Sequence, residues 1–375
     1  MEIIMIGPIT FTYEELLAKR EAGVSERLLE VLRKKADAIV EAGVLDVTQR
    51  TLRAPTGNPR DYTSMGPYWW PNPDTKDGLP YVNRDCQTNP ETVQPITPRK
   101  MYSNIRIVAT AAFYLGDEKY SEFVDKQLYA WYIDPETSMT PNARYSQGIP
   151  GICDGRGVGL IDFSSVHHMF DALGIVECMG KISKATADGV RAWYNKFLDW
   201  MLTHEQGYQA NIAINNHGAW FDAHVLTAAV ALDRRALAKK ICDTSYDIRH
   251  RRHIMDDGSQ PHELRRVSGI GYSLMNLDAL TVIANIADRL GYKQYWSVDE
   301  KRGKCLLRSA VDYLYPIIKE RANLPDNDPK KSKGSVAFSR LLVMMNERFP
   351  GEGYAERLME FDNLGEDVET LLPFE

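Results

Sequence analysis

Apolar residues recur at helical spacing through most of the chain. A clear example lies between residues 28 and 40, where the apolar residues at helical spacing are Leu28, Leu29, Leu32, Ala36, Ile39 and Val40. Residues 13–42 predict two helices that break near Gly23-Val24-Ser25. The same periodicity predicts further helices at 102–115, 118–131, 163–179, 184–203, 220–232, 235–246, 270–290, 303–315, 336–346 and 354–360.

Strand-like alternation of apolar and polar residues is scarce, so we expect an all-α fold. A long series of paired amphipathic helices is typical of an (α/α) toroid or of an α-solenoid. No repeat of fixed period is visible, which favours the toroid, an incomplete barrel of helical hairpins. No linker is long enough to divide the chain, so we expect residues 1–375 to form a single domain.

One long stretch, residues 52–98, does not fit the helical pattern. It is rich in Pro, Gly, Asn and Asp, as flexible loops are, but it also carries five of the chain's Tyr and Trp residues. These are Tyr62, Tyr68, Trp69, Trp70 and Tyr81. Linkers are poor in residues that need burial, and long structured loops are often functional. We therefore expect 52–98 to form a lid or cleft loop, and packing over one end of the barrel is an equally good interpretation.

Composition narrows the possible partners. The chain has 375 residues, 44% hydrophobic and 26% charged, which is enough for a large core. A net charge of −6 argues against a non-specific nucleic-acid partner, although a local Arg/Lys cleft can still bind an anionic substrate. No run of 18 apolar residues predicts a membrane span, and the first residues lack the features of a signal peptide. Five cysteines without a CxxC pair, and no evident cluster of metal ligands, predict neither a metal site nor a cofactor.

Polar residues gather where the apolar helix near residue 220 is expected to begin. Asn215, Asn216 and His217 are adjacent there, and either asparagine can cap the helix. A capping asparagine beside a half-buried histidine is the structural interpretation of this triplet. Further on, the basic stretch 249–253 is interpreted as a solvated face.

Four blocks in the same order resemble the alginate-lyase family of (α/α)-barrel polysaccharide lyases. The first contains DYTSMGPYWWPNP and covers 61–73, with 78–81 and 89–91. The second contains NARYSQGIPG and covers 139–151, with 155–162. The third is NNH at 215–217, and the fourth contains DGSQPHELRR and covers 257–266, with 272–277. Around Tyr272 the sequence departs from the family, because Gly269-Ile270-Gly271 stands where relatives often carry a larger residue.

This resemblance implies β-elimination at a uronic-acid glycosidic bond, without a cofactor. The catalytic positions it implies are Asn216, His217, Arg266 and Tyr272, and Arg265 is the neighbouring alternative to Arg266. It further implies substrate-binding residues, namely Tyr62, Tyr68, Trp69, Trp70, Tyr81, Asn142, Tyr145, Gln147, Arg156, Asn215, His262 and Arg265. The expected partner is an anionic polysaccharide such as alginate, preferably polymannuronate, or glucuronan. A polymer substrate favours a periplasmic or secreted location.

The chemistry explains why such residues are needed. Removing the C5 proton beside a carboxylate creates a second negative charge, which preorganised donors such as Asn216, His217 and Arg266 can stabilise. Tyr272 can act as base and acid when C5–H and O4 lie on one face of the sugar, as in β-mannuronate. Its ordinary pKa of about 10 must then be lowered by a cation, for which Arg266 is the candidate. In α-guluronate the two groups lie on opposite faces, and His217 is then the better base.

Other interpretations remain open at the level of sequence. Tyr272 can be a core residue of its helix, and Arg265 and Arg266 can be surface charges. A glycoside hydrolase of uronyl sugars needs two carboxylates across the scissile bond. Its candidates are Asp154 and Asp162, or Asp256, Asp257 and Glu263. A non-catalytic uronan-binding protein is a further alternative.

Overall fold

The computed structural model describes residues 7–324, 335–361, 364 and 367–373. The described residues are mainly helical, with short strands confined to the first half of the chain. Contacts divide the chain into two compact units that alternate along the sequence. Unit 1 comprises Met1–Pro8, Ala36–Ala213 and Thr227–Arg235, and unit 2 comprises Ile9–Lys35, Ile214–Leu226 and Ala236–Glu375. The helices α2 (Glu26–Ala42) and α8 (Asn216–Ala231) each contribute residues to both units.

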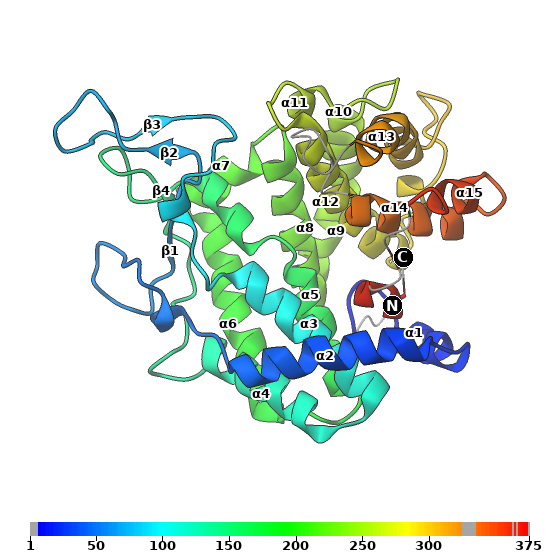
Figure 1. The fold of residues 1–375 in the computed structure, drawn as a ribbon, viewed down its shortest axis with the longest axis horizontal. Helices are drawn as coiled ribbons and strands as arrows, with labels where there is room; N and C mark the ends of the chain where they lie inside the picture. The colour runs from blue at the N-terminus through cyan, green and yellow to red at the C-terminus, as the bar shows by residue number, and fades with distance from the viewer. Residues whose placement is uncertain (1–6, 325–334, 362–363, 365–366, 374–375) are drawn as a thin grey trace. The chain divides into compact units, whose positions relative to one another are not determined.

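Unit 1 is built on helices that pack side by side. Its helices are α3 (Pro98–Leu115), α4 (Glu118–Tyr132), α5 (Val166–Cys178), α6 (Lys184–Thr203) and α7 (Glu205–Asn211). Helix α3 packs against α4 and α5, and α4 packs against α6 (Figure 1). Aromatic side chains fill the space between them, with Trp193 stacked on Phe197 at 5.0 Å and Tyr102 hydrogen-bonded to Tyr194 at 2.9 Å. These large buried rings account for much of the hydrophobic stabilisation of this unit.

The long aromatic stretch is not a featureless loop. Within it, β1 (Thr63–Met65) pairs in parallel with β4 (Tyr145–Gly148), while β2 (Trp69–Trp70) pairs in antiparallel with β3 (Val82–Asn83). Figure 1 shows β2 and β3 projecting from the helices of unit 1 with the loop that joins them. The pairing of β1 with β4 ties residues 52–98 to the loop that follows α4, although these segments are about 80 residues apart in the chain.

Unit 2 contains the remaining helices. They are α1 (Tyr13–Glu21), α9 (Arg235–Ser245), α10 (Arg251–His253), α11 (Pro261–Leu264), α12 (Gly269–Arg289), α13 (Leu306–Ala322), α14 (Ser335–Arg348) and α15 (Tyr354–Leu358). Helix α12 packs against α11 and α13, α13 packs against α14, and α14 packs against α15. Most side chains of α12 are buried, as expected for the central helix of an all-α unit.

The predicted helices are largely confirmed. Helix α6 has the predicted bounds, while α13 begins three residues later than predicted and extends to Ala322 despite Pro316. The prediction missed α7, a helix of seven residues.

The prediction of a solvated basic face at 249–253 was wrong. Arg249, His250 and His253 are 4%, 0% and 3% exposed. A π-helical turn over Tyr246–His250 follows α9, and the Arg249 guanidinium is neutralised by the buried carboxylate of Asp222. A buried counter-charge, which the sequence pattern does not reveal, makes this burial possible.

Helix α12 is long and apolar enough to cross a membrane by length and composition alone. However, 78% of its most apolar window is buried inside the protein. The same composition is typical of a central core helix, so it is weak support for a membrane span.

Candidate active site

Asn216 begins helix α8 in unit 2 and is held by a carboxylate from α11. Its main-chain N–H donates to Glu263 Oε1 at 2.6 Å, and its side-chain Nδ2 donates to Glu263 Oε2 at 2.8 Å. Both residues are 1% exposed. The first N–H groups of a helix have no partner within the helix, and here a glutamate from a distant segment accepts one of them. The side-chain orientation of Asn216 follows from the same carboxylate.

Arg266 and Tyr272 are brought together by the turn between α11 and α12. The Arg266 guanidinium carbon lies 4.5 Å from the centroid of the Tyr272 ring, and Nη2 donates to the phenol oxygen at 3.4 Å. Tyr272 lies in the first turn of α12 and its N–H donates to the carbonyl of Ser268. The structure therefore places a cation against the predicted base, and both side chains are half-buried.

The close packing between α11 and α12 depends on Gly269. A Cβ atom at this position would lie 2.7 Å from Leu264 Cα and 2.8 Å from Leu264 O. At Gly271, by contrast, a Cβ atom would meet nothing within 4 Å. The first glycine permits the tight approach that sets Tyr272 beside Arg266, while a side chain at the second would extend into open space.

The other predicted residues of unit 2 flank these two pairs. His217 follows Asn216 in the first turn of α8 and is half-buried, as is Asn215 before it. Arg265 is exposed, unlike Arg266. His262 is half-buried, with its ring 6.5 Å from that of His253. Because Arg266 rather than Arg265 contacts Tyr272, the geometry favours Arg266 as the functional arginine.

Unit 1 brings a second group of predicted residues together around Asp162. The family resemblance had assigned no function to this aspartate. Its Oδ2 accepts from the hydroxyls of Tyr62 at 3.0 Å and Ser64 at 2.5 Å, and its Oδ1 accepts from Gln147 Nε2 at 3.1 Å. Gln147 has a φ of 50°, a left-handed conformation that is strained for a residue with a side chain. Its N–H donates to Ser64 Oγ at 2.8 Å, which helps to hold it there.

Gln147 in turn orients Arg156. The guanidinium donates through Nε to the Gln147 carbonyl at 2.8 Å and through Nη2 to Gln147 Oε1 at 3.2 Å. Desolvation lowers the pKa of Arg156, and the negative charge of Asp162 acts in the opposite direction. The ring of Trp69 lies 5.9 Å from the guanidinium carbon. Gly66 makes room for both, since a Cβ atom there would lie 2.6 Å from Trp69 Cδ1 and 2.9 Å from Arg156 Nη2.

The predicted aromatic residues differ in burial. Tyr68, Trp69, Trp70 and Tyr81 are half-buried on or beside β2 and β3. Tyr62 is 2% exposed, packs edge-on against Phe163 at 4.9 Å and lies under the guanidinium of Arg50. Burial raises its pKa well above the ordinary value. Tyr62 thus supports Asp162 from within the core of unit 1.

The two other predicted positions in unit 1 lie on the loop that contains β4. Asn142 accepts the N–H of Arg144 at 3.1 Å through its side-chain oxygen, which stabilises a turn before the strand. Tyr145 is the first residue of β4 and is half-buried.

The carboxylates considered for a hydrolase are mostly engaged by neighbouring groups. Glu263 and Asp162 are bonded as described above. Asp256 pairs with Arg302 at 3.2 Å, and Asp257 accepts the N–H of Ser259 at 2.9 Å. Each of these four carboxylates is bonded to a neighbouring group, so they do not form the pair of available carboxylates that a hydrolase needs.

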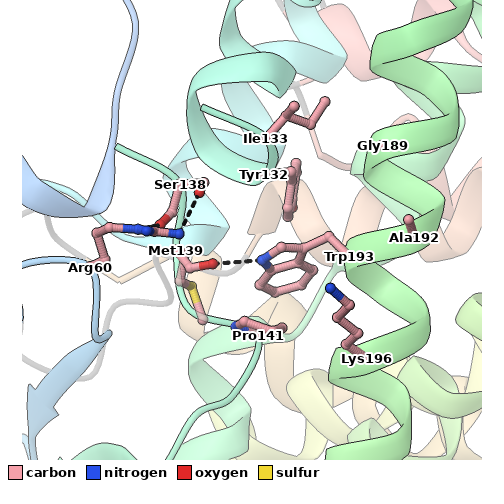
Figure 2. A pocket seen from close by; sticks show the side chains of 10 residues that line it. All are labelled: Arg60, Tyr132, Ile133, Ser138, Met139, Pro141, Gly189, Ala192, Trp193 and Lys196. Carbon is pink, nitrogen blue, oxygen red and sulfur yellow. Dashed lines mark hydrogen bonds between the residues drawn. The ribbon is translucent and has the colours of Figure 1, made fainter. Parts of the chain in front are cut away.

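A cavity of about 280 Å³ lies in unit 1 apart from the predicted residues. Figure 2 shows Arg60 on one side of it, donating to Ser138, and Trp193 on the other, donating to the carbonyl of Met139 at 2.6 Å. Its lining is largely apolar and contains none of the residues that the sequence pointed to. We therefore do not place the active site there.

In the part of the chain that the structure describes, no three His, Cys, Asp or Glu side chains are arranged to hold a metal ion. All five cysteines are free thiols, and Cys242 and Cys305 are buried.

Similarity to known proteins identifies the family of the chain. The family model "Alginate lyase" matches residues 46–324. An alginate lyase from Bacteroides ovatus is similar over 99% of this chain and 100% of its own, with 28% identity and a TM-score of 0.87. No curated protein matches the chain.

More distant structures share the fold. Alginate lyase A1-III from Sphingomonas species A1 has 16% identity and a TM-score of 0.55, and the alignment covers 95% of this chain and 92% of that one. A substituted form of A1-III in complex with a tetrasaccharide has 16% identity and a TM-score of 0.51, over 84% and 79% of the two chains.

The expected fold class, an all-α (α/α) toroid, is that of these structural neighbours and is confirmed. The family match covers well over half of the chain, including all four sequence blocks and both groups of polar residues. The chain therefore belongs to the alginate lyase family and is a polysaccharide lyase.

Proposed function

We propose that this lyase cleaves alginate by β-elimination, with polymannuronate as its preferred polymer. The observation that carries the proposal is the contact between Arg266 and Tyr272 in the first turn of α12. A cation against a phenol favours the phenolate, which is the form that accepts a proton. One residue that can both accept and return a proton suits a sugar whose C5–H and O4 lie on the same face.

In this mechanism the uronate carboxylate is neutralised first. Asn216 donates one side-chain N–H to Glu263, which leaves the other N–H for the substrate. His217 and Arg266 supply further donors, and Arg266 adds a positive charge. These donors stabilise the dianion that forms when C5 loses its proton, and fixed dipoles in a site of low dielectric do so better than water does.

The Tyr272 phenolate then removes the C5 proton. The electron pair of the C5–H bond becomes the C4=C5 double bond, and the C4–O4 bond breaks. The electron pair of the C4–O4 bond stays on this glycosidic oxygen, which leaves bonded to C1 of the neighbouring sugar. The phenol, now protonated, returns the proton to that oxygen. No water is consumed, and the new non-reducing end carries an unsaturated uronate.

We assign the residues of unit 1 to substrate binding. Arg156 carries a charged, half-buried guanidinium that is held by a neutral amide, so it is suited to a uronate carboxylate. The half-buried rings of Tyr68, Trp69, Trp70 and Tyr81 are suited to stacking on sugar rings. Closure of residues 52–98 as a lid over bound polymer belongs to the same proposal. Because polymeric substrates lie outside the cytoplasm, the proposal includes a periplasmic or secreted location for the enzyme.

The test is product analysis in heavy-oxygen water with polymannuronate, polyguluronate and glucuronan. The proposal predicts unsaturated oligosaccharides that absorb in the ultraviolet and carry no new heavy oxygen, formed fastest from polymannuronate. Faster cleavage of polyguluronate would instead assign the base to His217. Cleavage of glucuronan alone would keep the mechanism and change the substrate. Saturated products that carry heavy oxygen would overturn the elimination.

A further inference from the structure

Glu263 forms an unusual pair of contacts with a single residue. Its two carboxylate oxygens accept the main-chain and side-chain N–H groups of Asn216, at 2.6 and 2.8 Å. The two residues are 47 positions apart in the chain, and both are almost completely buried. A carboxylate in such a place therefore serves the segment around Asn216 rather than solvent or substrate.

Keeping a carboxylate in this environment is costly. Desolvation raises the pKa of Glu263, while the bonds from Asn216 and the positive charges of Arg266 and Arg265 act in the opposite direction. A neutral glutamine or an apolar side chain would avoid the cost of burying a charge. What the charged form provides is two acceptor oxygens in a fixed plane, which no other side chain of this length offers.

The pair of acceptors determines which way the Asn216 amide faces. Nδ2 donates one N–H to Glu263, and this fixes the directions of its second N–H and of the oxygen Oδ1. Turning the amide over would interchange Nδ2 and Oδ1 and break the bond to Glu263. The same short segment carries Arg266, whose N–H donates to the Glu263 carbonyl at 3.0 Å. Glu263 therefore links the start of α8 to the arginine that contacts Tyr272.

We propose that Glu263 is a positioning residue that orients the Asn216 carboxamide toward the uronate carboxylate. This inference rests on the proposed function of Asn216. Glu263 itself does not touch the sugar in this proposal, since its side chain is almost completely buried.

The competing interpretation is that Glu263 only caps helix α8. Capping predicts a loss of stability without a loss of turnover per folded molecule. Positioning predicts a fall in kcat with little change in KM, because a misdirected amide chiefly loses contacts that strengthen in the transition state. The two interpretations are therefore separable.

Glu263→Gln is the informative variant. Its amide oxygen can accept the main-chain N–H of Asn216, but its NH₂ group then faces the Nδ2 donor. The Asn216 amide must turn over to present its oxygen, which moves the remaining donors. We expect kcat to fall by about 100-fold on the best polymer, as for other small displacements of a catalytic group, with KM changed less than about threefold.

Asp299→Asn is the matched control. Asp299 is also buried in unit 2, and it accepts main-chain N–H groups from Lys301 at 2.9 Å and Arg302 at 3.0 Å. We expect this variant to unfold at lower temperature while keeping kcat within about threefold of the wild type, as an additive effect at a separate site does. Glu263→Asp, which keeps the charge on a shorter side chain, replaces Glu263→Gln if the latter does not fold.

A second measurement does not depend on turnover. The side-chain amide signals of Asn216 in a ¹⁵N spectrum are identified by their loss in Asn216→Ala. In the wild type we expect them to be protected from exchange with water, and in Glu263→Gln to shift and lose that protection. An inactive wild type with protected signals would refute the proposed function but not this contact. Unchanged Asn216 signals, or a kcat for Glu263→Gln close to that of the wild type, would overturn the inference.

Discussion

The guanidinium of Arg266 lies over the ring of Tyr272, with Cζ 4.5 Å from the ring centroid and Nη2 3.4 Å from the phenol oxygen. The two residues are six positions apart, and the turn between α11 and α12 folds one onto the other. The positive charge therefore acts on the hydroxyl that we assign to proton transfer.

Arg266→Gln should move the acid limb of the kcat/KM profile to higher pH. Without the cation the phenolate is less favoured, so a higher pH is needed to form the base. We also expect kcat at neutral pH to fall by about 100-fold or more, as for the loss of one oxyanion donor. The measurement is initial rate against pH on polymannuronate.

Arg265→Gln is the control for this variant, because it removes the neighbouring, exposed arginine. It should leave the position of the acid limb unchanged and act mainly on KM. An equal displacement of the limb in both variants would indicate a general electrostatic effect rather than the Arg266–Tyr272 contact.

The sequence predicted the helices well because their apolar faces repeat with the helical period. Helix α6 has the predicted bounds, and α2 begins just after the predicted break. The short helix α7 and the strands were missed, since elements of two to seven residues carry too little periodicity. The burial of Arg249 was missed because Asp222, its counter-charge, lies 27 residues away in the chain.

Arg156→Ala should raise KM on uronan by about tenfold or more with a smaller effect on kcat. A charge-assisted contact to a substrate carboxylate is worth about 1.5–3 kcal/mol, and it forms equally in the ground state and the transition state. Arg191→Ala is the control in the same unit, because Arg191 pairs with Glu177 at 2.6 Å. A similar KM in both variants would remove Arg156 from the binding site.

Acid should destabilise the protein through three buried histidines of unit 2. Burial lowers the pKa of His224 from 6.5 to about 3, and burial lowers the pKa values of His250 and His253 to about 4. Because the folded pKa values lie below the unfolded ones, the neutral rings contribute stability above about pH 6.5, which is lost as pH falls toward 4.

Each proton taken up on unfolding changes the free energy of unfolding by about 1.4 kcal/mol per pH unit. Urea titrations between pH 7 and pH 5 should therefore show falling stability. The Gln side chain of His253→Gln can still donate to Asn276. In this variant the slope of the free energy of unfolding against pH should correspond to the uptake of about one proton fewer. An unchanged slope would mean that His253 titrates alike in the folded and unfolded states.

The two glycines before Tyr272 should respond oppositely to alanine. Gly269→Ala should destabilise the protein by about 1–3 kcal/mol, because its Cβ would press against Leu264. It should also lower kcat, since α12 must move away from α11 and take Tyr272 with it. Gly271→Ala, with open space around its Cβ, should be neutral or stabilising by up to about 1 kcal/mol. Thermal unfolding and kinetics on both variants provide the test, and equal stabilities would contradict the packing.

The family motifs pointed to Asn216, His217, Arg266 and Tyr272, and the structure shows the local arrangement that pairs two of them. The sequence did not reveal the residues that hold the predicted site residues in place. Asp162 and Glu263 were considered as carboxylates of a hydrolase, and Asp162 also as a partner of Arg156. Their partners lie 15 to 100 residues away in the chain, so only the fold reveals that they hold Gln147 and Asn216.

The most direct test of the mechanism is the turnover of Tyr272→Phe on polymannuronate, followed by the ultraviolet absorbance of the unsaturated product. The variant lacks only the hydroxyl, so the ring can keep its contact with Arg266. Loss of proton transfer predicts a fall in kcat of about 100-fold to 10,000-fold, with polymer binding and thermal unfolding unchanged. A folded Tyr272→Phe enzyme that turns over at the wild-type rate would show that another residue takes the C5 proton.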